Sequence, residues 1–432
     1  MYFIIWLIGL CAIAAHAEDS TIDDGVKLKA RADFQSYAAF LHIRRDHPLN
    51  LDNEFLQIPK QQQVFFILPD LKLSSPTFSL IYRPELKVQI DTTELADSTK
   101  SSTITGARSR EFFGVLPATD FLTLTHGIQF FTWGPAEAMS PSNKMFPELI
   151  MKKNSFTATS SKYLSRINYS IGKNFSLIGI VEIGPSPEKS ADNQNPMQKF
   201  EPSGLAKAEW SWTGGKNYFG LVGGAQEMSN TWVGEYASVE IFNDVNLFFD
   251  ISHERNSKIL YPHQKNNGSG IADTFFFEQD RADDARLVTT SLFGAKYDFR
   301  NGSEIRSEII YYGLGYSQSQ LELAYDAIQT QSPLDELNRG ALRQNTLLFL
   351  GQKYAYFSLR CQEFMNVKDW NFYLKHLRSL TDHSSFNAIS FDYSWTDFLT
   401  LNIMYQANLG SMRSELGYYY TDTTIAGLKW SW

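Results

Sequence analysis

Three consecutive residues near the C-terminus, Asp382, His383 and Ser384, have side chains of the kinds that form a hydrolase triad. A triad needs the hydroxyl, imidazole and carboxylate arranged in sequence, and neighbours in one short loop do not readily reach that geometry. We therefore expect a solvated turn at this position, without a catalytic role.

No other catalytic or metal-binding motif is present. The sequence lacks His-Glu-x-x-His, Gly-x-Ser-x-Gly, a P-loop and a cysteine pair with metal-ligand spacing. Lys and Arg number 39 against 47 Asp and Glu, giving a net charge of −8 without a basic block, which disfavours a nucleic-acid partner. We predict no catalytic residue, no cofactor and no metal, and hence no enzyme.

The informative polar groups are charged residues that recur at every second position within apolar segments. This spacing puts them on one face of an extended strand, opposite the apolar face. On the lipid side of a membrane barrel each charge would cost about 2–4 kcal/mol near the midplane, so a barrel must turn them inward. The predicted lumen-lining residues are Lys27, Lys29, Arg31, Asp33, Lys162, Arg166, Lys207, Glu209, Asp250, Lys296, Asp298, Glu304, Arg306, Glu308, Lys375, Asp392 and Lys429.

Such alternating segments run through most of the chain, and each is about 9–14 residues long, the length of a membrane-spanning strand. In segment 398–407, Leu399, Leu401 and Ile403 share one face, while Thr400 and Asn402 share the other. The strands predicted most clearly are 120–131, 161–170, 203–213, 244–252, 286–299, 384–395, 398–407 and 421–432. Four earlier ones, 26–38, 62–72, 76–91 and 105–116, are weaker, and Pro84 interrupts the third.

Short turns alternate with long polar stretches between these strands. Gly172-Lys-Asn174, Asn243-Asp244 and Asn301-Gly302 are typical hairpin connections, whereas 132–160, 185–202, 255–285 and 315–343 are long. This pattern predicts an all-β fold: a transmembrane antiparallel barrel of about 16–18 strands with short periplasmic turns and long extracellular loops. A soluble sandwich is the alternative.

The C-terminal segment alternates to its last residue. Ala426, Leu428, Trp430 and Trp432 fall on one face, and terminal aromatic residues of a closing strand suit the membrane interface. This segment resembles the C-terminal signature by which Gram-negative outer-membrane barrels are recognised for insertion. We take Trp430 and Trp432 as the membrane insertion signal, with the barrel-assembly machinery as the implied partner.

The N-terminus carries an apolar run from Tyr2 to Ala15, followed by Ala15-His16-Ala17 before Glu18. An apolar core and small residues before a cleavage site are typical of a signal peptide. Residues 1–17 are therefore predicted to be removed, with 18–432 forming the barrel. An uncleaved anchor is the alternative, because the segment lacks Lys and Arg.

One part of the sequence resembles a family of poorly characterised Gram-negative outer-membrane porin-like barrels. Its motifs here are Arg110-Glu-Phe-Phe113, Gly127-Ile-Gln129, Trp133-Gly134 and Pro141-Ser-Asn143, covering with the last loops about a third of the chain. The resemblance implies a porin-like barrel and no particular substrate.

The segment after Trp133-Gly134 is long enough to fold into the lumen and narrow it, as constriction loops do in large barrels. Packing on the rim is the alternative. The constriction candidates within 132–160 are Trp133, Gly134, Glu137 and Asn143.

These features predict a porin-like channel in the bacterial outer membrane for passive diffusion of small hydrophilic solutes or ions. A barrel of this width leaves room for water, unlike an eight-stranded one. Salt bridges filling a closed lumen are the alternative to an open channel. A surface-exposed adhesive or structural barrel remains possible, as does an outer-membrane hydrolase with less support. Outer-membrane lipid is an expected partner.

Overall fold

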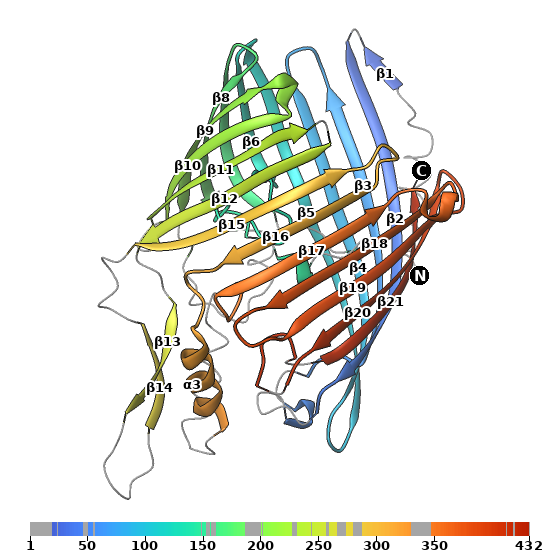
Figure 1. Cartoon of the computed structure of the whole chain (residues 1–432). Coiled ribbons are helices and arrows are strands. Elements are labelled where there is room, and N and C mark those ends of the chain that lie inside the picture. Colours follow the sequence, from blue (N-terminus) through green and yellow to red (C-terminus); the bar gives the residue numbers. More distant parts are fainter. Residues whose placement is uncertain are drawn as a thin grey trace, which may run out of the picture.

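The computed structural model describes residues 20–23, 25–45, 51–54, 57–147, 149–152, 156, 161–185, 200, 202–226, 231–242, 244–255, 259–265, 274–279, 287–329, 347–411, 413–417 and 420–431. These residues form a closed antiparallel barrel of 18 strands (Figure 1). The predicted fold class is confirmed at the upper end of the expected strand number. The predicted signal peptide 1–17 and Trp432 lie outside the described residues.

Each barrel strand pairs with its neighbours along the chain, and β21 closes the ring on β2 from Asp33↔Ser431 to Ile43↔Tyr420. The barrel strands are β2 (Val26–Ile43), β3 (Gln61–Ser74), β4 (Ser79–Glu94), β5 (Thr99–Thr119), β6 (Leu122–Gln129), β7 (Lys162–Ile171), β8 (Phe175–Gly184), β9 (Ser203–Trp212), β10 (Asn217–Gln226), β11 (Thr231–Phe242), β12 (Val245–Arg255), β15 (Val288–Asp298), β16 (Glu304–Tyr311), β17 (Lys353–Cys361), β18 (Trp370–Ser379), β19 (Ser385–Ser394), β20 (Leu399–Leu409) and β21 (Tyr420–Ser431).

The connections divide between the two ends of the barrel. At one end, here the turn end, lie the start of β2, the end of β21 and brief links such as 172–174 and 299–303. At the other, the loop end, the strands β6, β8, β12 and β16 end and the strands β7, β9, β15 and β17 begin. The strands thus bring every long segment of the described chain to one end.

Three strands and one α-helix of the described chain lie outside the ring. β1 (Ser20–Asp23), in a stretch that the sequence does not assign to a strand, pairs with the first residues of β2. Within the long connections, β13 (Leu260–Lys265) and β14 (Thr274–Gln279) form a hairpin beside the helix α3 (Gln318–Gln329), so 255–285 and 315–343 contain regular structure. No helix of the described chain is long and apolar enough to cross a membrane.

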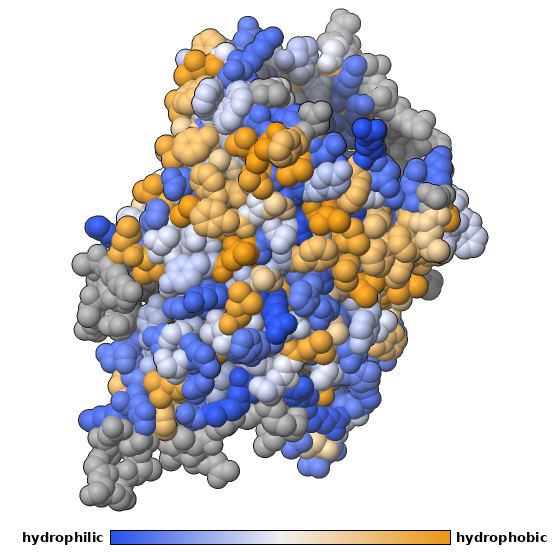
Figure 2. All heavy atoms as spheres, viewed as in Figure 1, coloured by the Kyte–Doolittle hydropathy of each residue, from blue (hydrophilic) through white to orange (hydrophobic). Residues whose placement is uncertain are grey.

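Alternation of side chains gives the wall two different faces. On β12, Phe248, Asp250 and Glu254 are buried, whereas Leu247, which precedes Phe248, is 45% exposed. Hydrophobic side chains gather on the outer surface over the strands, and hydrophilic ones dominate the loop end (Figure 2). Pro84, which the sequence predicts to interrupt a strand, lies within β4. The pairing of β4 with β5 shifts in register at this residue, and such an irregularity tolerates proline.

Candidate functional site

The connection between β6 and β7 leaves the wall at Gln129 and returns at Lys162, and its described residues contact strands far along the chain. Ala138, Met139 and Ile150 are almost fully buried in a cluster with residues of β12, β15 and β16. A loop packed on an outer rim would not bury these side chains against alternating positions of distant strands. We call the described part of residues 130–161 the inner segment.

Asp250 on β12 fixes one point of the inner segment. Its side chain is 0% exposed, and its carboxylate accepts hydrogen bonds from the Ser142 backbone N–H at 2.8 Å and the Ser140 hydroxyl at 2.6 Å. Gly134 has φ +87°, and a Cβ there would lie 2.5 Å from Asp250 Oδ2. The Trp-Gly motif therefore requires glycine for both its backbone angle and its close approach to the wall.

Glu308 on β16 fixes a second point. Its carboxylate accepts hydrogen bonds from the backbone N–H groups of Glu137 and Ala138 at 2.8 and 2.9 Å. Beside it, Arg306 donates to the Pro135 carbonyl at 2.7 Å and lies 3.4 Å from the Glu137 carboxylate. Backbone groups that would otherwise be buried unpaired thus find charged partners on the wall.

Further contacts extend the segment across the interior. Lys144 pairs with Glu254 at 2.6 Å, and the Trp133 indole N–H donates to the Ser142 hydroxyl at 3.1 Å. Asn143 accepts from the Phe146 N–H at 3.0 Å. Of the constriction candidates, Glu137 therefore contacts the wall, while Trp133 and Asn143 brace the segment itself.

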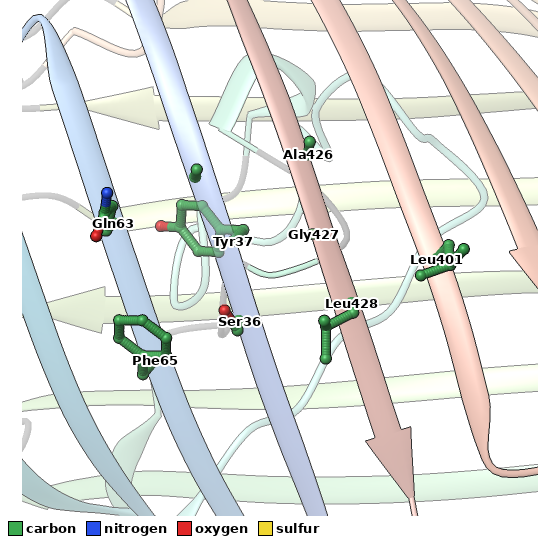
Figure 3. A pocket seen from close by; sticks show the side chains of 9 residues that line it. Ser36, Tyr37, Gln63, Phe65, Leu401, Ala426, Gly427 and Leu428 are labelled. Atoms are coloured by element: carbon green, nitrogen blue, oxygen red, sulfur yellow. The ribbon is translucent and has the colours of Figure 1, made fainter.

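The inner segment also reaches the strands that close the barrel. The ring of Phe156 lies 5.0 Å from that of Tyr37 on β2, and Gly427 on β21 leaves space for it. On the outer face of this wall, an open depression includes Ser36, Phe65, Leu401 and Leu428 (Figure 3). Its lining contains no charged residue, so it offers no ionic chemistry.

Most of the predicted lumen-lining residues meet a polar partner. Arg306 lies among Glu304, Glu308 and Glu137, and Asp392 accepts a hydrogen bond from Asn402. Four further ion pairs join Lys162–Glu182, Lys207–Glu209, Lys296–Asp298 and Asp33–Lys429 at 2.9, 2.9, 2.8 and 3.1 Å. Lys27, Lys29 and Arg31 are exposed near the turn end, and Lys375 is half-buried.

Arg166 differs from these residues in its surroundings. Its guanidinium lies 4.7 Å from the centre of the Phe131 ring, and its Nη2 reaches the Thr125 hydroxyl at 3.5 Å. Within the described chain no ion pair is formed by this side chain. The inner segment thus stacks on the wall cation Arg166. It also binds three wall carboxylates, those of Asp250, Glu254 and Glu308.

Ser140, Ser142, Lys144 and Glu254 take part in this site without having been selected from the sequence. Glu254 lies on the same face of β12 as Asp250, four positions further along. Extending the predicted strand 244–252 by two residues would have identified it. The serines offer no comparable pattern, because their role depends on where the inner segment crosses β12.

The expectation of a solvated turn at 382–384 is wrong in one respect. Ser384 is 0% exposed, and its hydroxyl donates to Asp382 Oδ1 at 2.6 Å. Asp382 Oδ2 accepts the backbone N–H of Glu415 at 2.6 Å. The serine bonds to the carboxylate and not to an imidazole, so the turn is a structural link between two loops.

Glu415 completes this link at the loop end. Its carboxylate accepts hydrogen bonds from the Leu350 and Gly351 N–H groups at 2.8 and 3.1 Å and from the Tyr354 hydroxyl. Burial raises the pKa of Glu415 to about 7 despite these bonds. Among the described residues no cluster of His, Cys, Asp and Glu could hold a metal ion.

Comparison with known proteins supports the fold. No family model and no curated protein matches the sequence. Among solved structures, Pseudomonas aeruginosa OccK7 (OpdD) has a TM-score of 0.53 at 11% identity, covering 94% of this chain and 98% of that one. Pseudomonas aeruginosa OpdQ gives 0.52 at 9% (95% and 99%), and a BenF-like porin from Pseudomonas fluorescens Pf-5 gives 0.51 at 9% (94% and 99%). At these identities the likeness establishes a shared barrel fold, and the sequence motifs themselves stay a prediction.

Proposed function

We propose that this chain is an outer-membrane channel for passive diffusion of small hydrophilic solutes or ions. The observation that carries the proposal is a wide barrel whose interior holds ionic side chains and a polar inner segment bound to Asp250 and Glu308. An 18-strand barrel is wider than side chains from the wall alone can fill. Its likeness to a BenF-like porin agrees with this function.

The outer surface supports a position in the membrane. Ile309, Val233 and Ile403 are 64%, 57% and 58% exposed on strands whose alternate residues are buried. Exposed aliphatic groups favour lipid contact, and closure leaves the ring without an unpaired edge in the hydrocarbon. We place the turn end in the periplasm and the loop end outside the cell.

In this proposal the inner segment narrows the channel. Glu137, Arg306 and Glu304 form an ionic cluster at its edge, where a passing solute would meet both signs of charge. The remaining lumen-lining candidates would keep the passage hydrated. Trp430, 54% exposed on the closing strand, would serve in assembly and at the lipid interface.

Swelling of liposomes that contain the refolded protein tests this function. Sugars of increasing size would be supplied outside the vesicles, and gel migration before and after heating would establish that the barrel had folded. We expect rapid swelling with the smallest sugars and a sharp decline with size. Vesicles that do not swell with any sugar, although the barrel is folded, would contradict the proposal.

A further inference from the structure

The first part of one long barrel strand has a partner strand on only one side. β5 pairs with β4 from Thr99 onward, but its pairing with β6 begins only at Phe112↔Ile128. The reason is the inner segment: the chain leaves the wall at Gln129, so no described strand continues beside the first part of β5. We call residues Thr99–Glu111 the free edge.

The free edge is open to its surroundings. Every residue from Thr99 to Ala107 is exposed, including Ile104 at 50%. A stretch of this length extends about 40 Å, and alternate residues of an antiparallel strand turn their N–H and C=O groups to each side. Unpaired backbone groups are not tolerated in hydrocarbon, so the free edge must stand in water at the loop end.

Its sequence suits pairing. Thr103, Ile104 and Thr105 favour extended structure, and the stretch contains no proline. Natural proteins block such edges with proline, bulges or charged side chains. Here Lys100 stands at one end, and Arg108, Arg110 and the register shift at Arg110 lie at the other. Nothing of that kind interrupts the residues from 101 to 107.

The charged side chains of the free edge indicate the charge of the segment that would pair with it. Arg108 is already bonded to Glu85 at 2.9 and 3.1 Å, which leaves Lys100 and Arg110 as cations without an ion pair in the described chain. Carboxylates opposite these two residues would form favourable cross-strand pairs. A second copy fits less well, because a two-fold antiparallel pairing centred on Thr105 would place Lys100 opposite Arg110.

We propose that the free edge of β5 is a docking site for an extended acidic segment of a partner protein, which adds to the barrel wall as a further strand. Main-chain hydrogen bonds supply the affinity of such β-augmentation, and the end charges supply selectivity. The site lies outside the channel, so it does not depend on transport.

The test uses the refolded full chain and synthetic peptides as long as Lys100–Arg110, of alternating Thr and Val. One peptide carries Glu at both ends and the other carries Lys. Binding would be followed by fluorescence anisotropy and by hydrogen exchange of residues 99–110. We expect the acidic peptide to bind about tenfold more tightly and to protect the free edge.

Two sets of variants make the test specific. The double variant Lys100→Glu/Arg110→Glu should reverse the preference between the peptides. Successive N–H groups of a strand point to opposite sides, so only one of the substitutions Ile104→Pro and Thr105→Pro removes an N–H group that points away from β4. That substitution should weaken peptide binding, while the conductance of the channel is unchanged. Absence of binding, an unchanged preference in the double variant, or a peptide-free dimer that depends on β5 would each overturn the proposal.

Discussion

The carboxylate of Asp250 accepts the backbone N–H of Ser142 at 2.8 Å, although the two residues are 108 positions apart. Asp250 is fully buried, and burying a carboxylate is unfavourable unless hydrogen bonds compensate. The inner segment provides these bonds through Ser142 and the Ser140 hydroxyl. The wall residue and the segment therefore stabilise each other.

Replacing Asp250 tests whether the inner segment limits the channel. Asp250→Ala leaves the Ser142 N–H and the Ser140 hydroxyl without their acceptor, at a cost of about 1–3 kcal/mol each. We expect the segment to loosen, the conductance to rise and larger sugars to enter liposomes. Conductance and the size limit of sugar uptake would be measured on the same preparation.

Asp298→Ala is the matched control for this variant. Asp298 pairs with Lys296 at 2.8 Å and, within the described chain, forms no hydrogen bond or ion pair with the inner segment. Its replacement should leave the size limit unchanged. If both variants and the unaltered protein admitted sugars up to the same size, the inner segment would not set the size limit of the channel.

Gly220 on β10 tests the packing of the interior. A methyl group there would overlap the ring of Tyr236, whose hydroxyl donates to Glu209 at 2.6 Å. We expect Gly220→Ala to lower the free energy of unfolding by about 1–3 kcal/mol. Urea unfolding in lipid vesicles would measure this, with Gly179→Ala, where nothing lies within 4 Å, as the harmless counterpart.

Substitutions at two isoleucines test which part of the barrel faces lipid and which part faces water. Ile309 is 64% exposed on β16, and Ile104 is 50% exposed on the free edge of β5. Ile309→Lys should destabilise the barrel in vesicles by about 2–4 kcal/mol, whereas Ile104→Lys should have little effect. The same urea titration applies, and a harmless Ile309→Lys would argue against the proposed membrane position.

We expect Glu415 to make the loop end sensitive to pH. Its pKa is raised from 4.5 to about 7 by burial, so its protonated form stabilises the folded loops below about pH 4.5. This contribution is lost as the pH rises through about 7. Hydrogen-exchange protection factors of the Leu350 and Gly351 N–H groups should fall between pH 5 and 8. Glu415→Gln should remove this dependence, and an equal fall in the variant would assign it to another group.

The barrel was predictable because the alternation of polar and apolar residues within each segment identifies that segment as a strand. Alternation on Lys296–Asp298 and Glu304–Glu308, together with turns such as Asn301-Gly302, is local information, and local patterns fix a strand and its two faces. The closing strand, β21, was predictable because its residues alternate in the same way.

The contacts of the inner segment were not predictable in this way. Trp133-Gly134 marks where the segment begins, but its partners Asp250 and Glu308 lie more than a hundred positions away. The free edge of β5 depends on the same event, since it exists because the chain turns inward after Gln129. Long-range pairing of this kind leaves no periodic trace in the sequence.

Planar-bilayer recording of the refolded mature protein across a salt gradient tests the central claim most directly. The account predicts discrete single-channel steps whose size depends on Asp250, with a reversal potential set by the charges near Arg306 and Glu137. A correctly folded barrel that inserts and conducts no current would show a sealed lumen and contradict the proposed function.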